Sequence, residues 1–398
     1  MRIYTLEVQE GMNAAIAGVG ESAVGVVPGR STLQLQTDAA RAATRDAGLT
    51  LRDIDGLITV PVSVEAWSVP CAVVASHLGL APRYLSTVNL AGASGAAMIH
   101  HAALAIASGE ATTVLCVAGQ NLLSSAKEAD PIDPVKAMAE SGVAHPQYEA
   151  PYGPLVPSLY ALIAQRHMHE FGTTPSQLAE VAAAIRGHAA LNASAHKREP
   201  ISVSDVLASR MVSSPLHVFD CSLVSDGACA VIVTSAERAT DLRRKPVRLL
   251  GQGYGLSHSY IGEHRNMTTT GAVQSGQQAF RSAGLKPSDV DVAEIYDCFT
   301  ITVIVELEDL GFCKKGEGGG FVEGGRIRLG GALPVTTHGG LLSYAHPGFA
   351  GGFFHVVEAV RQLRGEAGAR QVKDAEIALV HGNGGVASIH CTLLLGRG

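Results

Sequence analysis

The chain carries the same short motif twice, and this internal repeat constrains its fold more than any other sequence feature. The motif reads AGLTLRDID at residues 47–55 and AGLKPSDVD at residues 283–291, where it begins 236 positions later. Each copy follows an amphipathic helical pattern and precedes an apolar run typical of a buried strand, at residues 56–60 and 292–296. The repeat therefore predicts a duplicated α/β fold, with an N-terminal half over residues 1–245 and a C-terminal half over residues 246–398.

Other elements recur in the same order in both halves. Gly-rich strands at residues 14–20 and 247–253 precede the repeated unit, and strands at residues 113–119 and 377–380 come after long helices. Ser31 and Gln34 match a capping box at the start of the first helix, and Gly48 matches its left-handed end. Alternating strands and helices predict layered α/β structure with largely parallel sheets.

A segment at about residues 122–215 separates the two sets of elements. It is rich in Pro and His, and it shows helical patterns at Tyr160–His169 and Pro175–Ala190 but little strand pattern. A segment of this length is too long for a loop in a compact domain, so we expect an insertion that caps part of the fold.

Charge and hydropathy exclude several function classes. The chain has 30 Lys and Arg residues against 36 Asp and Glu residues, a formal net charge of −6. Binding to nucleic-acid phosphates requires clustered basic side chains, so we expect no nucleic-acid partner. No run of about 18 apolar residues is free of breakers, and the N-terminus does not resemble a signal peptide. We therefore expect no membrane association and a cytoplasmic location.

The cysteines indicate a reducing compartment. They are odd in number and form no CxxC pair, a pattern that favours free thiols over disulfides or a structural zinc site. The seven are Cys71, Cys116, Cys221, Cys229, Cys298, Cys313 and Cys391.

Two glycine-rich segments are candidate functional loops. Residues 87–97 lead from an apolar strand through a turn of small residues into a helix, an elbow that exposes backbone N–H groups to an anion or oxyanion. Tight backbone packing at a Gly-rich turn is an alternative explanation of residues 87–97 that requires no function. The second segment, residues 337–348, contains His338, Tyr344 and His346 among three glycines. Each histidine alone is more often structural, but together with Tyr344 they form a candidate site.

Two further candidates follow predicted strands. Tyr296 and Asp297 stand at a strand end, where catalytic groups of α/β folds often lie, although Asp297 could instead cap the next helix. His381 begins the sequence HGNGG after another strand, and its glycines, Gly384 among them, allow close backbone approach to a ligand or a loop. The pairs His100–His101 and His167–His169 have spacings unsuited to metal binding, and we expect no metal site.

These elements, in this order, resemble the thiolase superfamily, closest to its sterol-carrier-protein-like and lipid-transfer-protein branch. Supporting phrases include Ser225-Asp226-Gly227-Ala228, Tyr152-Gly153-Pro154 and Arg361-Gln362-Leu363-Arg364-Gly365, and the resemblance covers nearly the whole chain. It implies a duplicated five-layer α-β-α-β-α fold, an insertion that covers an acyl-CoA site, and an intimate homodimer.

The resemblance also shows which catalytic residues of the family this chain lacks. The family's nucleophilic cysteine stands in a CASG elbow, where this chain has Gly92 in the sequence GASG. The second reactive cysteine matches His381, and the asparagine of the NEAF motif matches Tyr296, whereas the GHP histidine is retained as His346. None of the seven cysteines occupies a catalytic position, which argues against thiolysis through an acyl-enzyme.

A carbon–carbon lyase needs no such cysteine. Retro-aldol cleavage of a β-hydroxyacyl-CoA releases an enolate and a carbonyl product, and it requires a base for the hydroxyl and a donor for the thioester oxygen. We expect Tyr296 to act as the base and His346 to stabilise the oxyanion, with His381 and Tyr344 assisting. The backbones of Gly92 and Gly384 are expected near the oxyanion, and the residues expected to contact substrate are His338, Asn121 and Tyr152.

This description resembles the steroid side-chain aldolases of the same branch, which carry a glycine at the elbow and the phrase Tyr-Asp-x-Phe-Thr found at residues 296–300. Those aldolases also use a second tyrosine in the HGG loop. In this chain His346 takes its position, and Tyr344 lies two residues earlier. The resemblance further implies a small partner protein with a zinc ribbon and an OB fold, and no cofactor other than the coenzyme A of the substrate.

Two alternatives remain at this stage. One is an acyltransferase of thiolase type with an unusual nucleophile such as Cys298. The other is a catalytically silent subunit that binds acyl-CoA or lipid, because fold analogy does not establish activity.

Overall fold

The repeated motif forms the same local structure in both halves of the computed structural model, which describes residues 13–128 and 142–398. Helix α1 ends at Gly48 with φ of 76°, and helix α10 ends at Gly284 with φ of 68°; a short 3₁₀ turn and a strand follow each. Glycine adopts this left-handed conformation without a steric penalty. At the other end of α1, Ser31 and Gln34 form the expected capping box.

The elements of the N-terminal half, before the insertion, are β1 (Ala14–Glu21), α1 (Thr32–Ala47), β2 (Gly56–Thr59), α2 (Pro70–Leu78), β3 (Tyr84–Thr87), α3 (Ser94–Ala107) and β4 (Thr113–Asn121). The insertion and the return to the sheet contribute α4 (Leu122–Glu128), α6 (Val156–Phe171), α7 (Pro175–Ala190), α8 (Val203–Ala208), β5 (Met211–Ser213), β6 (Leu216–His217), β7 (Asp226–Ser235) and α9 (Ala236–Thr240). The C-terminal half contains β8 (Val247–Leu256), α10 (Ala272–Ala283), β9 (Val292–Ile295), α11 (Thr300–Asp309), α12 (Gly318–Phe321), α13 (Phe353–Arg364), β10 (Ile377–Gly384) and β11 (Ile389–Arg397).

Nine strands join in one sheet with the order β3-β2-β4-β7-β1-β8-β11-β10-β9, in which the pairing of β1 with β8 connects the two halves, and β5 and β6 form a separate pair. The expectation of largely parallel sheets is wrong. Among the strand pairs of this sheet in the described residues, β2–β3, β2–β4 and β9–β10 are parallel, and the others are antiparallel. Strand β7 returns from the insertion in the opposite direction to β4, and β11 follows β10 through a tight hairpin.

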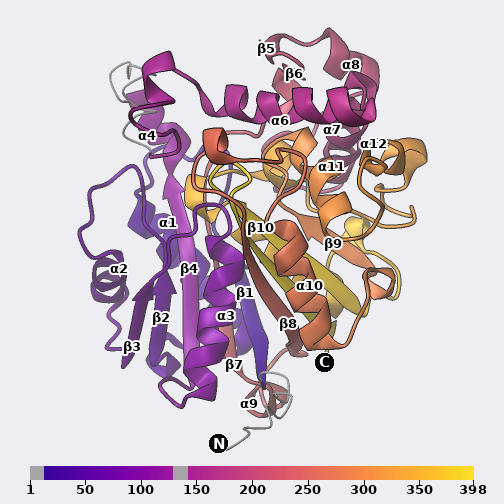
Figure 1. Ribbon diagram of the computed structural model, residues 1–398. Helices are drawn as coiled ribbons and strands as arrows, with labels where there is room; N and C mark the ends of the chain where they lie inside the picture. The colour runs from indigo at the N-terminus through magenta and orange to yellow at the C-terminus, as the bar shows by residue number, and fades with distance from the viewer. Residues whose placement is uncertain (1–12, 129–141) are drawn as a thin grey trace, which may run out of the picture.

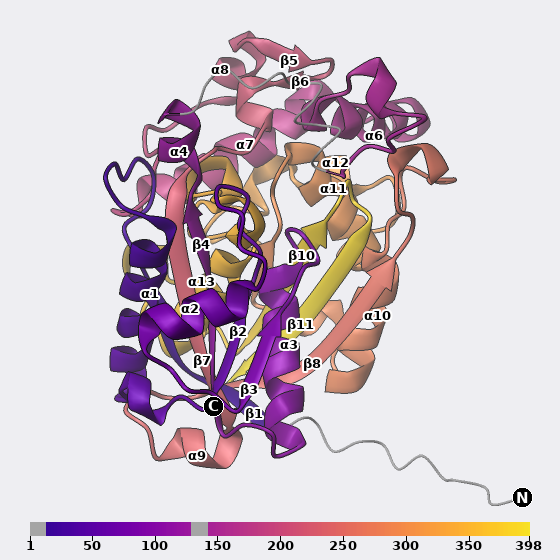
Figure 2. The ribbon, with the colours of Figure 1, turned by 90° about the vertical axis from the view of Figure 1, so that its left-hand side faces the viewer.

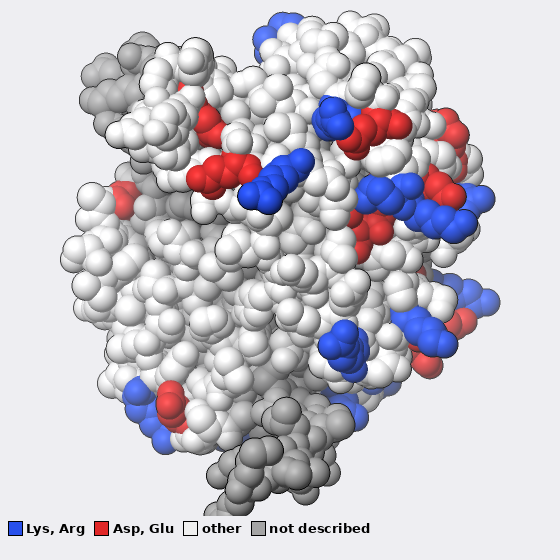
Figure 3. All heavy atoms as spheres, viewed as in Figure 1, with Lys and Arg blue, Asp and Glu red and all other residues white. Residues whose placement is uncertain are grey.

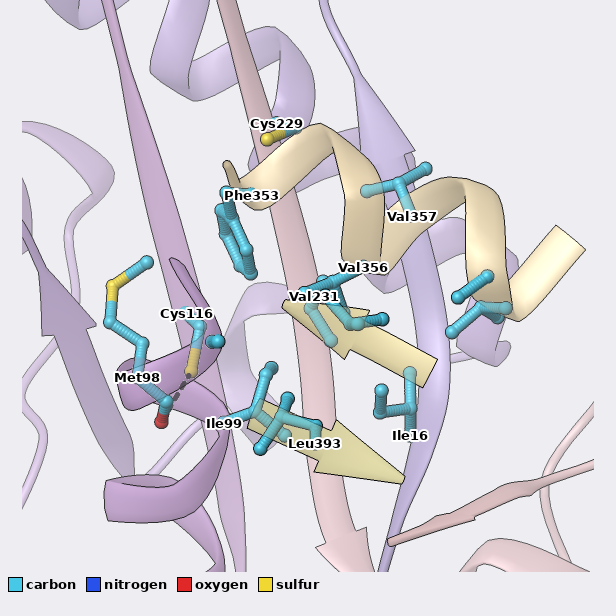
Figure 4. Close-up of a cluster of buried hydrophobic side chains, with 14 of the residues drawn as sticks. Ile16, Met98, Ile99, Cys116, Cys229, Val231, Phe353, Val356, Val357 and Leu393 are labelled. Atoms are coloured by element: carbon cyan, nitrogen blue, oxygen red, sulfur yellow. Dashed lines mark hydrogen bonds between the residues drawn. The ribbon is translucent and has the colours of Figure 1, made fainter. Parts of the chain in front are cut away.

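The layers are those of the expected five-layer fold. Helices α3 and α13 each contact strands from both halves and lie between them, whereas α1 and α10 cover the outer faces. Alternating side chains on β4 show the two faces, since Leu115 and Val117 pack with α1 and Cys116 and Ala118 pack in the central layer. Figure 4 shows this central layer, where Phe353 and Val356 of α13 lie near Ile99 of α3.

The insertion lies over one end of the sheet. Figures 1 and 2 both show α6, α7 and α8 above the ends of the long strands, on the side where β4 leads into α4. The described residues of the region 122–215 therefore lie over these strand ends. Among the described residues, no helix combines the length and apolar character needed to cross a bilayer.

Candidate active site

A strand-to-helix elbow between β3 and α3 places Gly92 at the centre of the candidate site. Ser94 fastens the elbow, because its hydroxyl accepts a hydrogen bond from the Leu90 backbone N–H at 2.9 Å and donates one to the Ala91 carbonyl at 2.7 Å. A Cβ atom at position 92 would stand 2.3 Å from both the Tyr296 hydroxyl oxygen and the Asn383 carbonyl oxygen. The elbow therefore has no room for a side chain, and the Tyr296 hydroxyl occupies the place beside it.

Tyr296 follows β9 and is held by the neighbouring strand. Its backbone N–H donates to the His381 carbonyl of β10 at 3.0 Å, and its ring is 6% exposed. Burial raises the pKa of the Tyr296 phenol well above its ordinary value, and the nearby Cys298, Asp297 and Glu306 raise it further. The phenol is therefore protonated near neutral pH.

His346 is the hydrogen-bond partner of this phenol. The Tyr296 hydroxyl oxygen lies 3.4 Å from His346 Nε2, and His346 Nδ1 lies 3.0 Å from the Ser222 hydroxyl. Burial lowers the pKa of His346 to about 4, although Asp297 and a hydrogen bond to the Leu223 backbone partly oppose the shift. A neutral imidazole that donates from Nδ1 to the Ser222 hydroxyl leaves the Nε2 lone pair to accept the tyrosine proton.

The loop that carries His346 is positioned by Asp297. The Asp297 carboxylate accepts hydrogen bonds from the backbone N–H groups of Leu341 at 2.8 Å and Leu342 at 3.1 Å, within a π-helical turn at Gly340–Tyr344. Gly340 has φ of 55°, and a Cβ atom there would collide with the same carboxylate. Asp297 thus secures this turn and does not cap α11, whose N-cap residue is Phe299.

These groups face a cavity of about 380 Å³ beneath the insertion. One wall is aromatic: the rings of Tyr160, from α6, and Phe299 stack with centroids 4.4 Å apart. The Tyr160 hydroxyl donates to the Gly385 carbonyl at 3.1 Å and accepts from the Ala387 N–H at 3.2 Å, so it ties the cap to the HGNGG loop. The other side chains in the wall are mainly apolar: Leu122, Val143, Val156, Pro157, Leu223, Val224 and Phe349.

The structure brings together three of the residues singled out from the sequence, because Gly92, Tyr296 and His346 all line the cavity. Tyr344 does not join them. Its hydroxyl donates to Glu21 Oε1 at 2.9 Å, on the side of the loop that faces a separate, charged cavity with Arg361. His338 also lies outside the cavity, where it is buried and hydrogen-bonded to Glu294 at 3.0 Å.

The remaining expected site residues are likewise outside the cavity wall. His381 is fully buried between Thr392 at 2.8 Å and His390 at 3.0 Å, and Gly384 packs against the Leu90 carbonyl. Asn121 accepts a hydrogen bond from the Thr32 hydroxyl at 2.8 Å. Tyr152 is 88% exposed on the insertion and does not line the cavity.

Two cysteines line the cavity, Cys221 and Cys298. Burial raises the pKa of the Cys221 thiol to about 12 and that of the Cys298 thiol still higher. An activated nucleophile requires a thiol pKa below its ordinary value, so neither environment favours the thiolate. The alternative nucleophile Cys298 is therefore a protonated, buried thiol.

Two buried groups in the described chain contain three potential metal ligands each: Glu294, His338 and His355, and Glu306, His381 and His390. Hydrogen bonds within each group, from His338 to Glu294 and between His381 and His390, account for this clustering. Both groups lie next to residues of the cavity wall: His355 stacks on Tyr296 with ring centroids 6.1 Å apart, and Glu306 accepts a hydrogen bond from Asn383 at 2.8 Å.

Sequence reasoning missed three polar residues of the site. Ser222 has no local motif, and its place beside His346 depends on contacts between residues 124 positions apart. Asn383 lies within the HGNGG sequence but was not distinguished from the glycines around it. His355 lies on α13, where the helical pattern of the sequence signals only a buried face.

The comparisons with known proteins identify the family. Residues 13–211 match the thiolase N-terminal domain family, and residues 253–397 match the thiolase C-terminal domain-like family. The chain is 36% identical over 385 residues to an acetyl-CoA acetyltransferase from Methanothermobacter thermautotrophicus, covering 95% of this chain and 98% of that protein. It is also 36% identical over 383 residues to a steroid side-chain-cleaving aldolase from Thermomonospora curvata, covering 94% and 95%.

A solved structure of an Ltp2-ChsH2(DUF35) aldolase is similar over 97% of this chain and 98% of that chain, with a TM-score of 0.85 and 34% sequence identity. Similarity therefore extends equally to an acyltransferase and to an aldolase, and overall identity does not separate the two activities.

Proposed function

This chain belongs to the thiolase superfamily, and from that premise we propose that it is a CoA-thioester carbon–carbon lyase. It belongs to the sterol-carrier-protein-like and lipid-transfer-protein-like branch in which the elbow lacks the nucleophilic cysteine. The proposed reaction is retro-aldol cleavage of a β-hydroxyacyl-CoA without an acyl-enzyme intermediate.

One observation carries this proposal: the Tyr296 hydroxyl stands where a side chain at position 92 would begin. A thiolase holds an acyl group on the elbow cysteine. Here the elbow offers a phenol within hydrogen-bond distance of a neutral histidine, at 3.4 Å. Catalytic hydrogen bonds are often long in unliganded sites and shorten when substrate binds.

The pair provides a route for the proton. As the Cα–Cβ bond breaks, the β-hydroxyl loses its proton to the Tyr296 oxygen, which passes its own proton to His346 Nε2. The electron pair of the broken bond moves into the thioester as an enolate, and the proton returns from His346 through Tyr296 to Cα. The products are a ketone or aldehyde and a shorter acyl-CoA, so the reaction needs neither a co-reactant nor a cofactor.

Acyl transfer receives less support from the site. The two thiols in the cavity wall, Cys221 and Cys298, have raised pKa values. Ping-pong chemistry through either would require a thiolate that burial disfavours.

The lining of the cavity supports a hydrophobic acyl group. Its aromatic and aliphatic wall suits a steroid side-chain substrate or another bulky hydrophobic acyl chain. One similar protein is named for cleaving steroid side chains, and the similar solved structure is an aldolase named together with a DUF35 component. We propose by analogy that a small protein with an OB fold and a zinc ribbon is a partner of this chain.

A homodimer is also part of the proposal. Strand β3 is an edge of the sheet, and residues 84–109 contain no charged side chain. Figure 3 shows few charged side chains over α3, and Val69, Leu85 and Leu104 are 51%, 45% and 49% exposed. An edge strand beside apolar surface is a feature that proteins usually cover. Sedimentation equilibrium tests this part of the proposal.

The direct test incubates the protein, alone and with such a partner, with β-hydroxyacyl-CoA substrates whose β-carbon carries a bulky apolar group. The proposal predicts equal amounts of carbonyl product and shortened acyl-CoA, detected by mass spectrometry. Binding without turnover under both conditions would instead support a silent binding subunit, and transfer of an acyl group to a second CoA thioester would support an acyltransferase.

A further inference from the structure

A buried carboxyl group lies directly behind the cavity and is not used in the proton route. Glu306, on α11, is 1% exposed, and its only side-chain hydrogen bond in the described part of the chain comes from Asn383 at 2.8 Å. Its Oε2 atom has no partner there, and the one basic side chain within ion-pair distance is His381 at 3.9 Å. Burial keeps that imidazole neutral by lowering its pKa.

A carboxylate in this position would be an unpaired buried charge, which is strongly unfavourable. The neutral acid avoids this cost, and burial accordingly raises the pKa of Glu306 well above its ordinary value. A protonated Glu306 must place its O–H group on an acceptor.

The free acceptor beside it is the Asn383 amide oxygen. Asn383 is 2% exposed, and its Oδ1 atom has no hydrogen-bond partner among the described residues. The orientation of an amide follows from its partners. When Glu306 donates its proton to Oδ1, the amide of Asn383 turns over, so that Oδ1 faces the carboxyl group and the NH₂ group faces away from it. The NH₂ group is then available to the cavity that Asn383 lines.

The two side chains of the proton route do not supply a donor for the thioester oxygen. His346 accepts from Tyr296 at Nε2 and lies against the Ser222 hydroxyl at Nδ1, so in its neutral form it does not donate to substrate. Asn383 stands beside the elbow, because its carbonyl oxygen lies 2.3 Å from the position of a Cβ at residue 92.

We infer that the side-chain amide of Asn383 is a catalytic donor to the thioester and enolate oxygen, and that Glu306 is a positioning residue that orients this amide. The inference rests on the proposed lyase function, which it deepens by assigning the oxyanion donor. As the Cα–Cβ bond breaks, negative charge grows on the thioester oxygen, and a donor already aimed at it stabilises the transition state more than the substrate.

The test compares Asn383→Ala, Glu306→Gln and the control Asn192→Ala in the full-length protein, with its partner if the wild type requires one. Asn192 is another buried asparagine, which donates to the His338 carbonyl at 2.9 Å and lies outside the cavity. Two readouts are used: kcat for cleavage of a β-hydroxyacyl-CoA, and exchange of the Cα protons of a saturated acyl-CoA in D₂O, which reports enolate formation alone.

Loss of one oxyanion donor typically lowers kcat by about 10²- to 10³-fold. We expect Asn383→Ala to lose cleavage and exchange by about this factor with KM changed little, whereas Asn192→Ala retains both activities. Glu306→Gln keeps an N–H donor for Oδ1 and should remain active near neutral pH. Wild-type activity should fall at alkaline pH as Glu306 ionises, and Glu306→Gln should lack this component of the decline.

The outcomes separate this inference from the proposed function. If the wild type cleaves substrate and Asn383→Ala cleaves it as well as Asn192→Ala does, the donor assignment is wrong and the lyase function stands. If Asn383→Ala is impaired but the wild type and Glu306→Gln have the same alkaline profile, Glu306 does not orient the amide. If the wild type neither cleaves nor exchanges, the proposed function fails and the inference fails with it.

Discussion

The lack of space around Gly92 predicts that even one methyl group at this position inactivates the protein. In Gly92→Ala, the new Cβ would lie 2.3 Å from the Asn383 carbonyl oxygen and from the Tyr296 hydroxyl, about 1 Å closer than van der Waals contact allows. The carbonyl belongs to β10, which is paired with β11 on one side and β9 on the other, so the ring of Tyr296 must move. Because its hydroxyl is already 3.4 Å from His346, such a shift breaks the hydrogen bond.

Two effects of predictable size follow. Overpacking of this kind costs about 1–3 kcal/mol of unfolding free energy. Loss of the general acid–base pair lowers kcat by about 10²- to 10⁴-fold. Steady-state cleavage of a β-hydroxyacyl-CoA and thermal unfolding measure the two effects. Gly92→Cys should behave in the same way and gain no thiolysis, because its Cβ meets the same atoms.

Gly187→Ala is the matched control, since a Cβ at position 187 meets nothing within 4 Å and the residue lies inside helix α7. This variant should keep full activity and gain about 0.5–1 kcal/mol of stability. If Gly92→Ala retained wild-type kcat and an unchanged melting temperature, Tyr296 would not occupy the elbow as described, and the reasoning would be refuted.

Four other predictions follow from the same contacts. Tyr296→Phe should lower kcat for cleavage by about 10²- to 10⁴-fold while acyl-CoA still binds by calorimetry, and unchanged turnover would remove Tyr296 from the mechanism. Because burial lowers the pKa of His346 to about 4, kcat should stay constant as pH falls from 7 to 5 and decline only near pH 4; a decline centred near 6.5 would contradict a buried neutral imidazole. Burial also lowers the pKa of His390 to about 4. As pH falls from about 6.5 toward 4, the unfolded chain therefore protonates His346 and His390 before the folded protein does, and the free energy of unfolding decreases. Urea unfolding over this pH range measures the decrease. Tyr160→Phe removes two hydrogen bonds between the cap and the HGNGG loop, so it should cost about 1–3 kcal/mol and raise KM more than it lowers kcat; an unchanged KM would show that the cap does not shape the cavity.

Much of the fold could be predicted from the sequence because local signals set the elements. Gly48 and Gly284 mark helix ends, and the repeat places the same turn and strand after each. Strand direction could not be predicted in this way. The antiparallel pairing of β7 with β4 and β1 depends on how the chain returns after a long insertion, and no local pattern records it.

The site was only partly predictable for a similar reason. Tyr296 and His346 lie in motifs at strand and loop ends, where chemistry is often found, and both line the cavity. Tyr344 lies two residues from His346, but the intervening turn directs it toward Glu21, a residue 323 positions away. Proximity in sequence therefore identified the loop and not the direction of its side chains, which tertiary contacts determine.

The central claim is that this protein cleaves a carbon–carbon bond of an acyl-CoA substrate without a cysteine nucleophile. The most direct measurement is a single-turnover reaction of the double variant Cys221→Ser/Cys298→Ser, which removes both thiols of the cavity wall, with a β-hydroxyacyl-CoA. The account predicts carbonyl product and shortened acyl-CoA at close to the wild-type rate, and no acyl adduct on the wild-type protein by intact-mass analysis. Loss of turnover in the double variant, together with an acyl adduct on Cys221 or Cys298 of the wild type, would contradict it.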